Sequence, residues 1–195
     1  MNRTRPVPKA AAWRWLPVLL LTTPMVALAH TGAVPPVGFG HGLLHPLTGL
    51  DHLLAALGVG LWATLQPGAP GRRLPVVFLS ALLLGLPLGA AWPTPVAEIG
   101  VLGSVLLLGV ALALLLRLPV IPNLVLVALF GLVHGHVHGT ELLPGAGLSY
   151  VAGLLTGTAL LTGAGYLTGR LLHRWQRIGA LRYAGMALLL LGLLS

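Results

Sequence analysis

Two short segments of an otherwise apolar sequence carry closely spaced histidines and carboxylates. One is HPLTGLDH, residues 45–52, and the other is HGHVHGTE, residues 134–141. The groups that could hold a metal ion are His45, Asp51, His52, His134, His136, His138 and Glu141. Imidazole and carboxylate together suit divalent nickel, cobalt or zinc, whereas Cu(I) favours the sulfur of Cys or Met. The chain contains no cysteine, so the two segments predict binding of a divalent transition-metal cation.

The composition around these segments is that of a membrane protein. Of the 195 residues, 56% are hydrophobic and only 7% are charged, whereas soluble domains carry about a quarter charged residues. Ionisable groups inside a membrane are costly and are kept where they face a partner, an ion or water. The net charge of +8 comes from a few basic residues next to apolar runs. It is not a basic stripe with interleaved aromatics, so it gives no indication of nucleic-acid binding.

The first 29 residues have the layout of a secretory signal peptide. Basic residues within residues 1–14 precede a short apolar run at residues 16–26, and ALA at residues 27–29 supplies a small-x-small cleavage pattern. Cleavage there makes His30 the first residue of the mature chain, where its α-amine and imidazole can chelate a divalent cation together. An uncleaved first transmembrane helix is the alternative. Pro17 and Pro24 interrupt the apolar run and favour cleavage.

The mature chain, residues 30–195, predicts a single all-α domain, a polytopic membrane bundle of six helices. About 20 apolar residues of helix cross a bilayer core. Apolar segments of suitable length recur at residues 42–65, 74–92, 96–116, 119–141, 148–171 and 179–195. The connections between them are short and rich in Pro and Gly, which leaves no room for a soluble domain.

Arginines set the expected orientation of these helices. Signal cleavage places His30 outside, and the loops then alternate between the two sides of the membrane. All basic residues after the signal peptide fall on the cytoplasmic side: Arg72, Arg73, Arg117, Arg170, Arg174, Arg177 and Arg182. This distribution agrees with the positive-inside rule. We therefore expect a multi-pass protein of the bacterial inner membrane with both mature termini on the periplasmic side.

Depth in the membrane predicts that the two polar segments face each other. The first expected span runs inward and the fourth runs outward, which brings His52 and His134 close to mid-membrane. His45 lies about 10 Å further out at 1.5 Å per residue, and His138 and Glu141 rise outward over a similar range. A stepped series of partial sites is what ion conduction requires, because an ion must both enter and leave. Interhelical hydrogen bonding without any metal is the structural alternative.

Helical spacing sorts these side chains further, because residues three, four or seven apart share a face. By this rule the first and fourth spans each present one polar face, and the two faces carry His41, His45, His52, His134, His138 and Glu141. His136 points elsewhere on a regular helix. Asp51 either ligates the cation directly or orients a neighbouring imidazole.

In these features the sequence resembles the HupE/UreJ family of membrane proteins. The resemblance rests on HPLTGLDH with the following Gly58, on HGHVHGTE, on the histidine directly after the signal peptide and on the six-span layout. The H-x5-DH element is also similar to, though one residue longer than, the signature of the separate nickel/cobalt permease family. The resemblance implies a transporter rather than an enzyme. It implies uptake of nickel, with cobalt as the alternative, in support of hydrogenase or urease maturation, and makes His45, Asp51 and His52 the key motif residues.

Two other functions also use histidines on membrane helices. An intramembrane zinc hydrolase needs a metal-held water and an acid–base group, and the sequence lacks an HExxH element. A haem b protein could use His52 and His134 as axial ligands, but this role leaves Asp51 and the outer histidines unexplained. We therefore expect no prosthetic group.

The expected partners are the transported ion and membrane lipid, and a homo-oligomer is compatible with the pattern. No nucleotide-binding loop is present, so the driving force is an ion gradient or the membrane potential. An inside-negative potential favours cation entry by about 2.3 kcal/mol per charge per 100 mV.

Overall fold

The structure is a computed structural model that describes residues 38–142 and 145–194. The expected signal peptide, its cleavage site and His30 lie outside these residues. Every regular element in the described ranges is a helix, and no strand occurs there. The helices are α2 (Phe39–Thr48), α3 (Leu50–Ala63), α4 (Gly68–Ala91), α5 (Val96–Ala113), α6 (Val120–Thr140), α7 (Leu148–Arg174) and α8 (Ala180–Gly192). The expected all-α class is confirmed.

The length and composition of the helices indicate a helical membrane protein. Four apolar segments are long enough to cross a bilayer: Gly71–Ala91 of α4, and the whole of α5, α6 and α7. α3 and α8 are also apolar but have only 14 and 13 residues. A helix of that length extends about 20 Å, which is less than a bilayer core of about 30 Å. Each of the six expected spans therefore contains a helix, but those in the first and last are shorter than expected.

A break at Gly49 divides the segment that we expected to form one continuous first span, residues 42–65. α2 and α3 lie on either side of Gly49, whose backbone is extended with φ −99° and ψ 120°. Glycine disfavours helix by about 1 kcal/mol relative to alanine, and Pro46 inside α2 removes a backbone donor. The expectation that the histidines of this span share one helical face is therefore wrong, because they lie on two separate helices.

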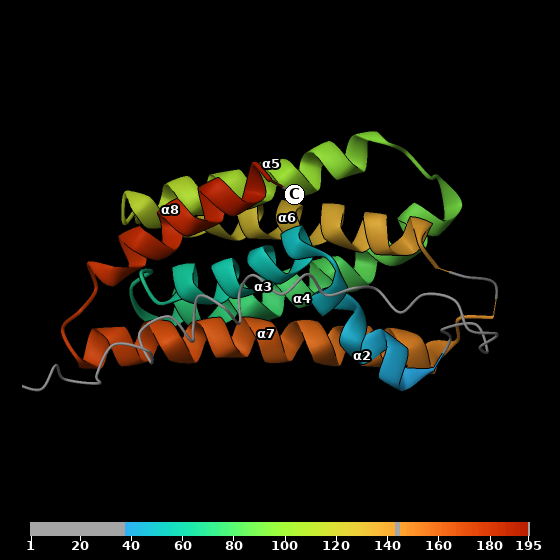
Figure 1. The fold of residues 1–195 in the computed structure, drawn as a ribbon, viewed down its shortest axis with the longest axis horizontal. Helices are drawn as coiled ribbons and strands as arrows, with labels where there is room; N and C mark the ends of the chain where they lie inside the picture. Colours follow the sequence, from blue (N-terminus) through green and yellow to red (C-terminus); the bar gives the residue numbers. More distant parts are fainter. Residues whose placement is uncertain (1–37, 143–144, 195) are drawn as a thin grey trace, which may run out of the picture. The chain divides into compact units, whose positions relative to one another are not determined.

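Small residues let α4 and α6, which run side by side in Figure 1, pack closely. A Cβ atom on Gly131, Gly135 or Gly139 of α6 would collide with a backbone carbonyl oxygen of α4. Such close approach is typical of membrane helices with small residues at four-residue spacing. Because the histidine face of α6 lies beside this glycine stripe, packing on α4 leaves His134 and His138 facing α2 and α3.

The remaining helices enclose an apolar interior. α2 and α3 pack on α7, and α5 packs on α8. The apolar core includes the buried side chains Trp62, Phe78, Leu82, Leu108, Val127, Phe130 and Leu154. Successive helices from α4 to α8 alternate in direction in Figure 1, so the helix ends that carry arginine gather at one end of the bundle. The start of α5 and the end of α6 lie at the other end.

Candidate metal site

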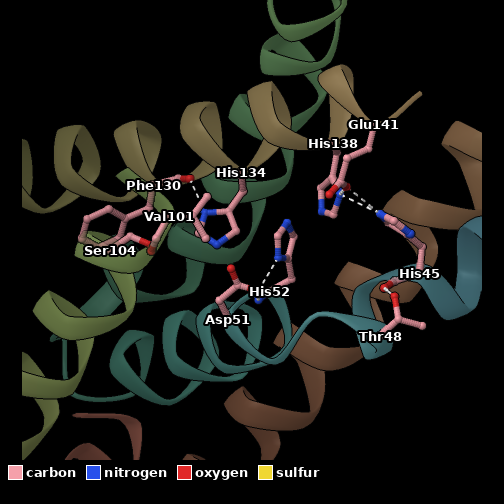
Figure 2. A network of polar contacts seen from close by, with 10 residues as sticks. All are labelled: His45, Thr48, Asp51, His52, Val101, Ser104, Phe130, His134, His138 and Glu141. Atoms are coloured by element: carbon pink, nitrogen blue, oxygen red, sulfur yellow. Dashed lines mark hydrogen bonds and ion pairs between the residues drawn. The ribbon is translucent and has the colours of Figure 1, made fainter. Parts of the chain in front are cut away.

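Three side chains converge where the end of α6 approaches α2 (Figure 2). The Nε2 atom of His45 lies 3.1 Å from Nδ1 of His138 and 3.1 Å from Oε2 of Glu141. The third separation, from His138 Nδ1 to Glu141 Oε2, is 3.5 Å. His45 comes from α2. His138 lies in the last turn of α6, and Glu141, three residues later, directly follows that helix. The cluster therefore joins two elements that are distant in the sequence.

These separations suit a shared metal ion. Imidazole nitrogen and carboxylate oxygen bind zinc at about 2.0–2.2 Å. Two ligand atoms at such distances, at tetrahedral or right angles, are about 2.8–3.6 Å apart. The same separations are hydrogen-bond distances when a proton takes the place of the ion. The three side chains can thus exchange a proton for a divalent cation with little rearrangement.

His52 and His134 continue the row of imidazoles deeper into the protein, between α3 and α6 (Figure 2). The centroid of the His52 ring lies 4.2 Å from that of His138 and 5.3 Å from that of His134. His45 and His52 come from the first polar segment, and His134 and His138 come from the second. The expectation that the two segments face each other is confirmed.

Hydrogen bonds fix which nitrogen of His52 and of His134 carries the proton. Asp51 Oδ1 accepts from Nδ1 of His52 at 2.7 Å and from its backbone N–H at 2.8 Å. Nδ1 of His134 donates to the carbonyl oxygen of Phe130 at 2.8 Å. In each neutral ring, Nε2 is then left with a lone pair. Both Nε2 atoms are buried and have no hydrogen-bond partner among the described residues.

This arrangement is typical of histidines that bind metal. A ligating imidazole usually donates its other nitrogen to a carboxylate or a backbone carbonyl, which fixes the tautomer and the ring orientation. A buried polar atom without a partner is rare in folded proteins. The lone pairs on Nε2 of His52 and of His134 would have a partner if a cation bound between the two rings.

A cavity of about 190 Å³ lies against the outer cluster and is lined by His45, Thr48, Gly49, His52, His138 and Glu141. The most exposed side chains lie at the outer end of the row. The exposed fraction is 46% for Glu141 and 27% for His45, against 10% for His52. His138 and His134 are buried. The site is therefore open at the Glu141 end and closed at His134.

Glu141 follows the last residue of the α6 span, at the open end of the site. Hydrogen bonds from His138 and His45 hold the pKa of its carboxyl well below the usual value for glutamate. The group is therefore ionised at neutral pH. A negative charge at the mouth of the cavity attracts a cation and offsets part of the cost of removing its water.

Three other polar residues lie away from the row. The ring of His136 points to the opposite side of α6, where Nε2 lies 3.2 Å from Oγ1 of Thr94 beside an apolar cavity of about 480 Å³. His41 is exposed on α2, and Glu98 is exposed in the first turn of α5. The regular helix expected for the fourth span explains why His136 diverges from its neighbours.

Some residues near the site were not singled out from the sequence. Thr48 Oγ1 donates to the backbone carbonyl of His45 at 2.7 Å, which closes the last turn of α2. A Cβ atom on Gly49 would lie 3.0 Å from His52 Nδ1, so a larger residue would press on that ring. Tyr150 of α7 lies 5.9 Å from His45 between ring centroids. Thr48 and Gly49 fall inside the motif HPLTGLDH, but Tyr150 had no signal beyond its place at a span end.

The sequence matches a known protein family and one curated relative. Residues 18–195 match the family described as HupE / UreJ protein. The chain is also similar to Protein HupE of Rhizobium leguminosarum bv. viciae, with 36% identity over 137 residues. That alignment covers 69% of this chain and 71% of the relative. No solved structure matches the chain.

Proposed function

The chain belongs to the HupE/UreJ family, and from this membership and the geometry of the site we propose that it carries divalent nickel, with cobalt as the alternative, across the inner membrane into the cell. The proposal depends most on the buried Nε2 atoms of His52 and His134. Hydrogen bonds to Asp51 and to the carbonyl oxygen of Phe130 hold the ring proton on Nδ1, so each Nε2 keeps a lone pair. In this role the protein is a transporter and not an enzyme. The imported metal would supply hydrogenase or urease maturation.

The row of ligands gives the cation two successive stations. At the outer station His45, His138 and Glu141 replace part of the hydration shell of the ion, while the cavity leaves room for the remaining water. At the inner station the Nε2 atoms of His52 and His134 take over. His138 belongs to the outer station and also connects it to the inner one, since its ring contacts both His45 and His52. Partial sites in series favour movement over tight retention.

The direction of movement follows from charge. The helix ends that carry arginine gather at one end of the bundle, and the positive-inside rule assigns that end to the cytoplasm. The open mouth at Glu141 then faces the periplasm. An inside-negative membrane potential favours entry of a divalent cation by about 4.6 kcal/mol at 100 mV, so no nucleotide is needed to drive uptake.

Uptake into proteoliposomes tests the proposal. Purified protein in vesicles with an inside-negative potential should accumulate Ni²⁺, or Co²⁺ in competition with it, faster than protein-free vesicles. His138→Ala should reduce uptake roughly 10- to 100-fold, the range typical of disturbed metal sites. His136→Ala, on the same helix but outside the row, should leave uptake near that of the unaltered protein.

Two results would contradict the proposal. One is the absence of nickel, cobalt and zinc uptake by protein that is folded and correctly inserted. The other is equal uptake by the His138 and His136 variants. A strong loss with His136→Ala would restore the expectation from sequence that His136 binds metal.

A further inference from the structure

Asn123 is a buried polar residue that the site described above does not use. It lies in the first turn of α6, at the end of the bundle that carries arginine, and only 1% of its surface is exposed. Its backbone N–H donates to Pro119 O. Its side-chain Oδ1 is buried and has no hydrogen-bond partner among the described residues. Removing a carbonyl oxygen from water without a new partner destabilises a protein.

Asn123 lies on the histidine face of α6. It is eleven residues before His134, which is about three turns and about 16 Å along the helix. At about 100° per residue, an eleven-residue step returns to nearly the same direction. His134 and Asn123 therefore point to the same side of α6, one at the deep end of the imidazole row and the other near the opposite end of the helix.

An apolar layer separates these two polar positions. Val127 and Phe130 lie between them on the same face of α6, and both are buried. The ring of Phe78 lies 5.7 Å from that of His134, and all three apolar side chains belong to one core cluster. In this structure the path is thus polar from Glu141 to His134, closed by hydrocarbon beyond it, and polar again at Asn123.

We propose that Asn123 is a third station of the same metal path, beyond the inner station of His52 and His134, where its carbonyl oxygen coordinates the partly hydrated divalent cation after the cation has passed the layer of Val127 and Phe130. This inference rests on the proposed transport function. A neutral amide oxygen is a weaker ligand for nickel or cobalt than imidazole. A weak final ligand suits release, because an ion that is held too strongly does not leave the pathway.

A purely structural role for Asn123 makes the opposite prediction. A structural amide would have partners for its oxygen, and its replacement would reduce stability. An unpartnered oxygen has no such bonds to lose. Replacement by an apolar residue of similar size should therefore leave stability unchanged or increased. Loss of uptake without loss of stability would identify a role in transport.

The experiment compares Asn123→Leu with Thr158→Val in proteoliposomes, each at matched protein content. Thr158 is a buried polar residue on α7 whose hydroxyl is satisfied by Leu154 O in its own helix. We expect Asn123→Leu to reduce Ni²⁺ uptake roughly tenfold or more. The Ni²⁺ affinity of Asn123→Leu, measured by calorimetry in detergent, should equal that of the unaltered protein. Its thermal unfolding temperature should be equal or higher. Thr158→Val should leave uptake unchanged.

The outcomes separate this inference from the proposed function. If the unaltered protein transports nickel and Asn123→Leu transports it equally well, Asn123 is not a station and the transport function stands. If the unaltered protein transports no metal, the proposed function itself fails. If Asn123→Leu does not accumulate, Asn123→Ala decides the question, because it removes the oxygen donor with a smaller side chain. Reduced uptake by an inserted Asn123→Ala protein supports the station, and unchanged uptake overturns it.

Discussion

At the scale of single residues, the two nitrogens of each deep imidazole have different tasks. Nδ1 of His52 and of His134 is used to hold the ring, and Nε2 is left free with a lone pair. The residue that holds His52 is Asp51, its immediate neighbour. Of the two roles that the sequence allowed for Asp51, ligand or orienting group, the structure favours the orienting group.

Asp51→Asn should therefore reduce metal uptake roughly 10- to 100-fold, the usual effect of losing a group that orients a metal ligand. An asparagine can turn its NH₂ group toward Nδ1 of His52, which would move the ring proton to Nε2 and remove the lone pair. It also lacks the negative charge that offsets desolvation of the cation. The measurement is uptake at matched protein content, with Glu98→Gln as control, since that change removes an exposed acid outside the row.

Interhelical hydrogen bonding without metal would give a different result for Asp51→Asn. Asparagine keeps hydrogen-bonding capacity, so a purely structural Asp51 should tolerate the change or lose function through poor accumulation. Near-normal uptake by a well-accumulated Asp51→Asn protein would count against the metal path.

At the scale of elements, α6 presents two neighbouring stripes with different tasks. The glycines at residues 131, 135 and 139 press against α4, while the histidines at 134 and 138 face α2 and α3. The glycine stripe therefore fixes the rotation of α6 about its axis, and with it the direction of the imidazoles. Replacement of one of these glycines should affect both stability and the site.

Gly135→Ala should destabilise the protein by about 1–3 kcal/mol, the typical cost of overpacking. Its Cβ would collide with the backbone carbonyl of Leu82, which cannot move aside as a flexible side chain would. Gly103→Ala on α5 is the matched control, because a Cβ there has no neighbour within 4 Å. Thermal unfolding in detergent should show a lower midpoint for Gly135→Ala and an equal or higher one for Gly103→Ala. Equal midpoints would show that the helices tolerate separation.

The helices were largely predictable from hydropathy, and the break at Gly49 was not. Apolar runs gave α5 and α6 within a few residues of their bounds, since the length of a membrane helix is constrained by the bilayer. A hydropathy profile is the same for one continuous helix and for two short ones, because both contain the same apolar residues. The positions of His45 and His52 depend on that difference.

At the scale of the whole molecule, the pairing of the two polar segments was predictable and their detailed contacts were not. Topology and rise per residue were enough to bring His52 opposite His134 and His45 opposite His138. The tautomers, the unpartnered Nε2 atoms and the proximity of Tyr150 depend on how side chains pack in three dimensions. Periodicity alone cannot supply them. Asn123 was overlooked because a single amide in an apolar run has no motif around it.

The orientation of the molecule in the membrane gives the last prediction. The sequence has no cysteine, so single cysteines can report sidedness without background. Gly147 and Gly179 are exposed, precede α7 and α8, and have open space around an added Cβ. With the Glu141 end in the periplasm, Gly147→Cys should react with a membrane-impermeant maleimide in intact spheroplasts. Gly179→Cys should react only after permeabilisation, because it lies among the arginines at the opposite end of the bundle.

The reverse labelling pattern would place the open mouth of the site in the cytoplasm. The protein would then be oriented for metal export, since Glu141, His45 and His138 would first meet ions from inside the cell. N-terminal sequencing gives an independent check, because a mature chain that begins at His30 requires the segment before α2 to be translocated. The positive-inside distribution of the seven arginines after residue 30 favours the periplasmic mouth. Labelling of Gly147→Cys from outside, together with a His30 terminus, would establish that the open mouth of the site faces the periplasm.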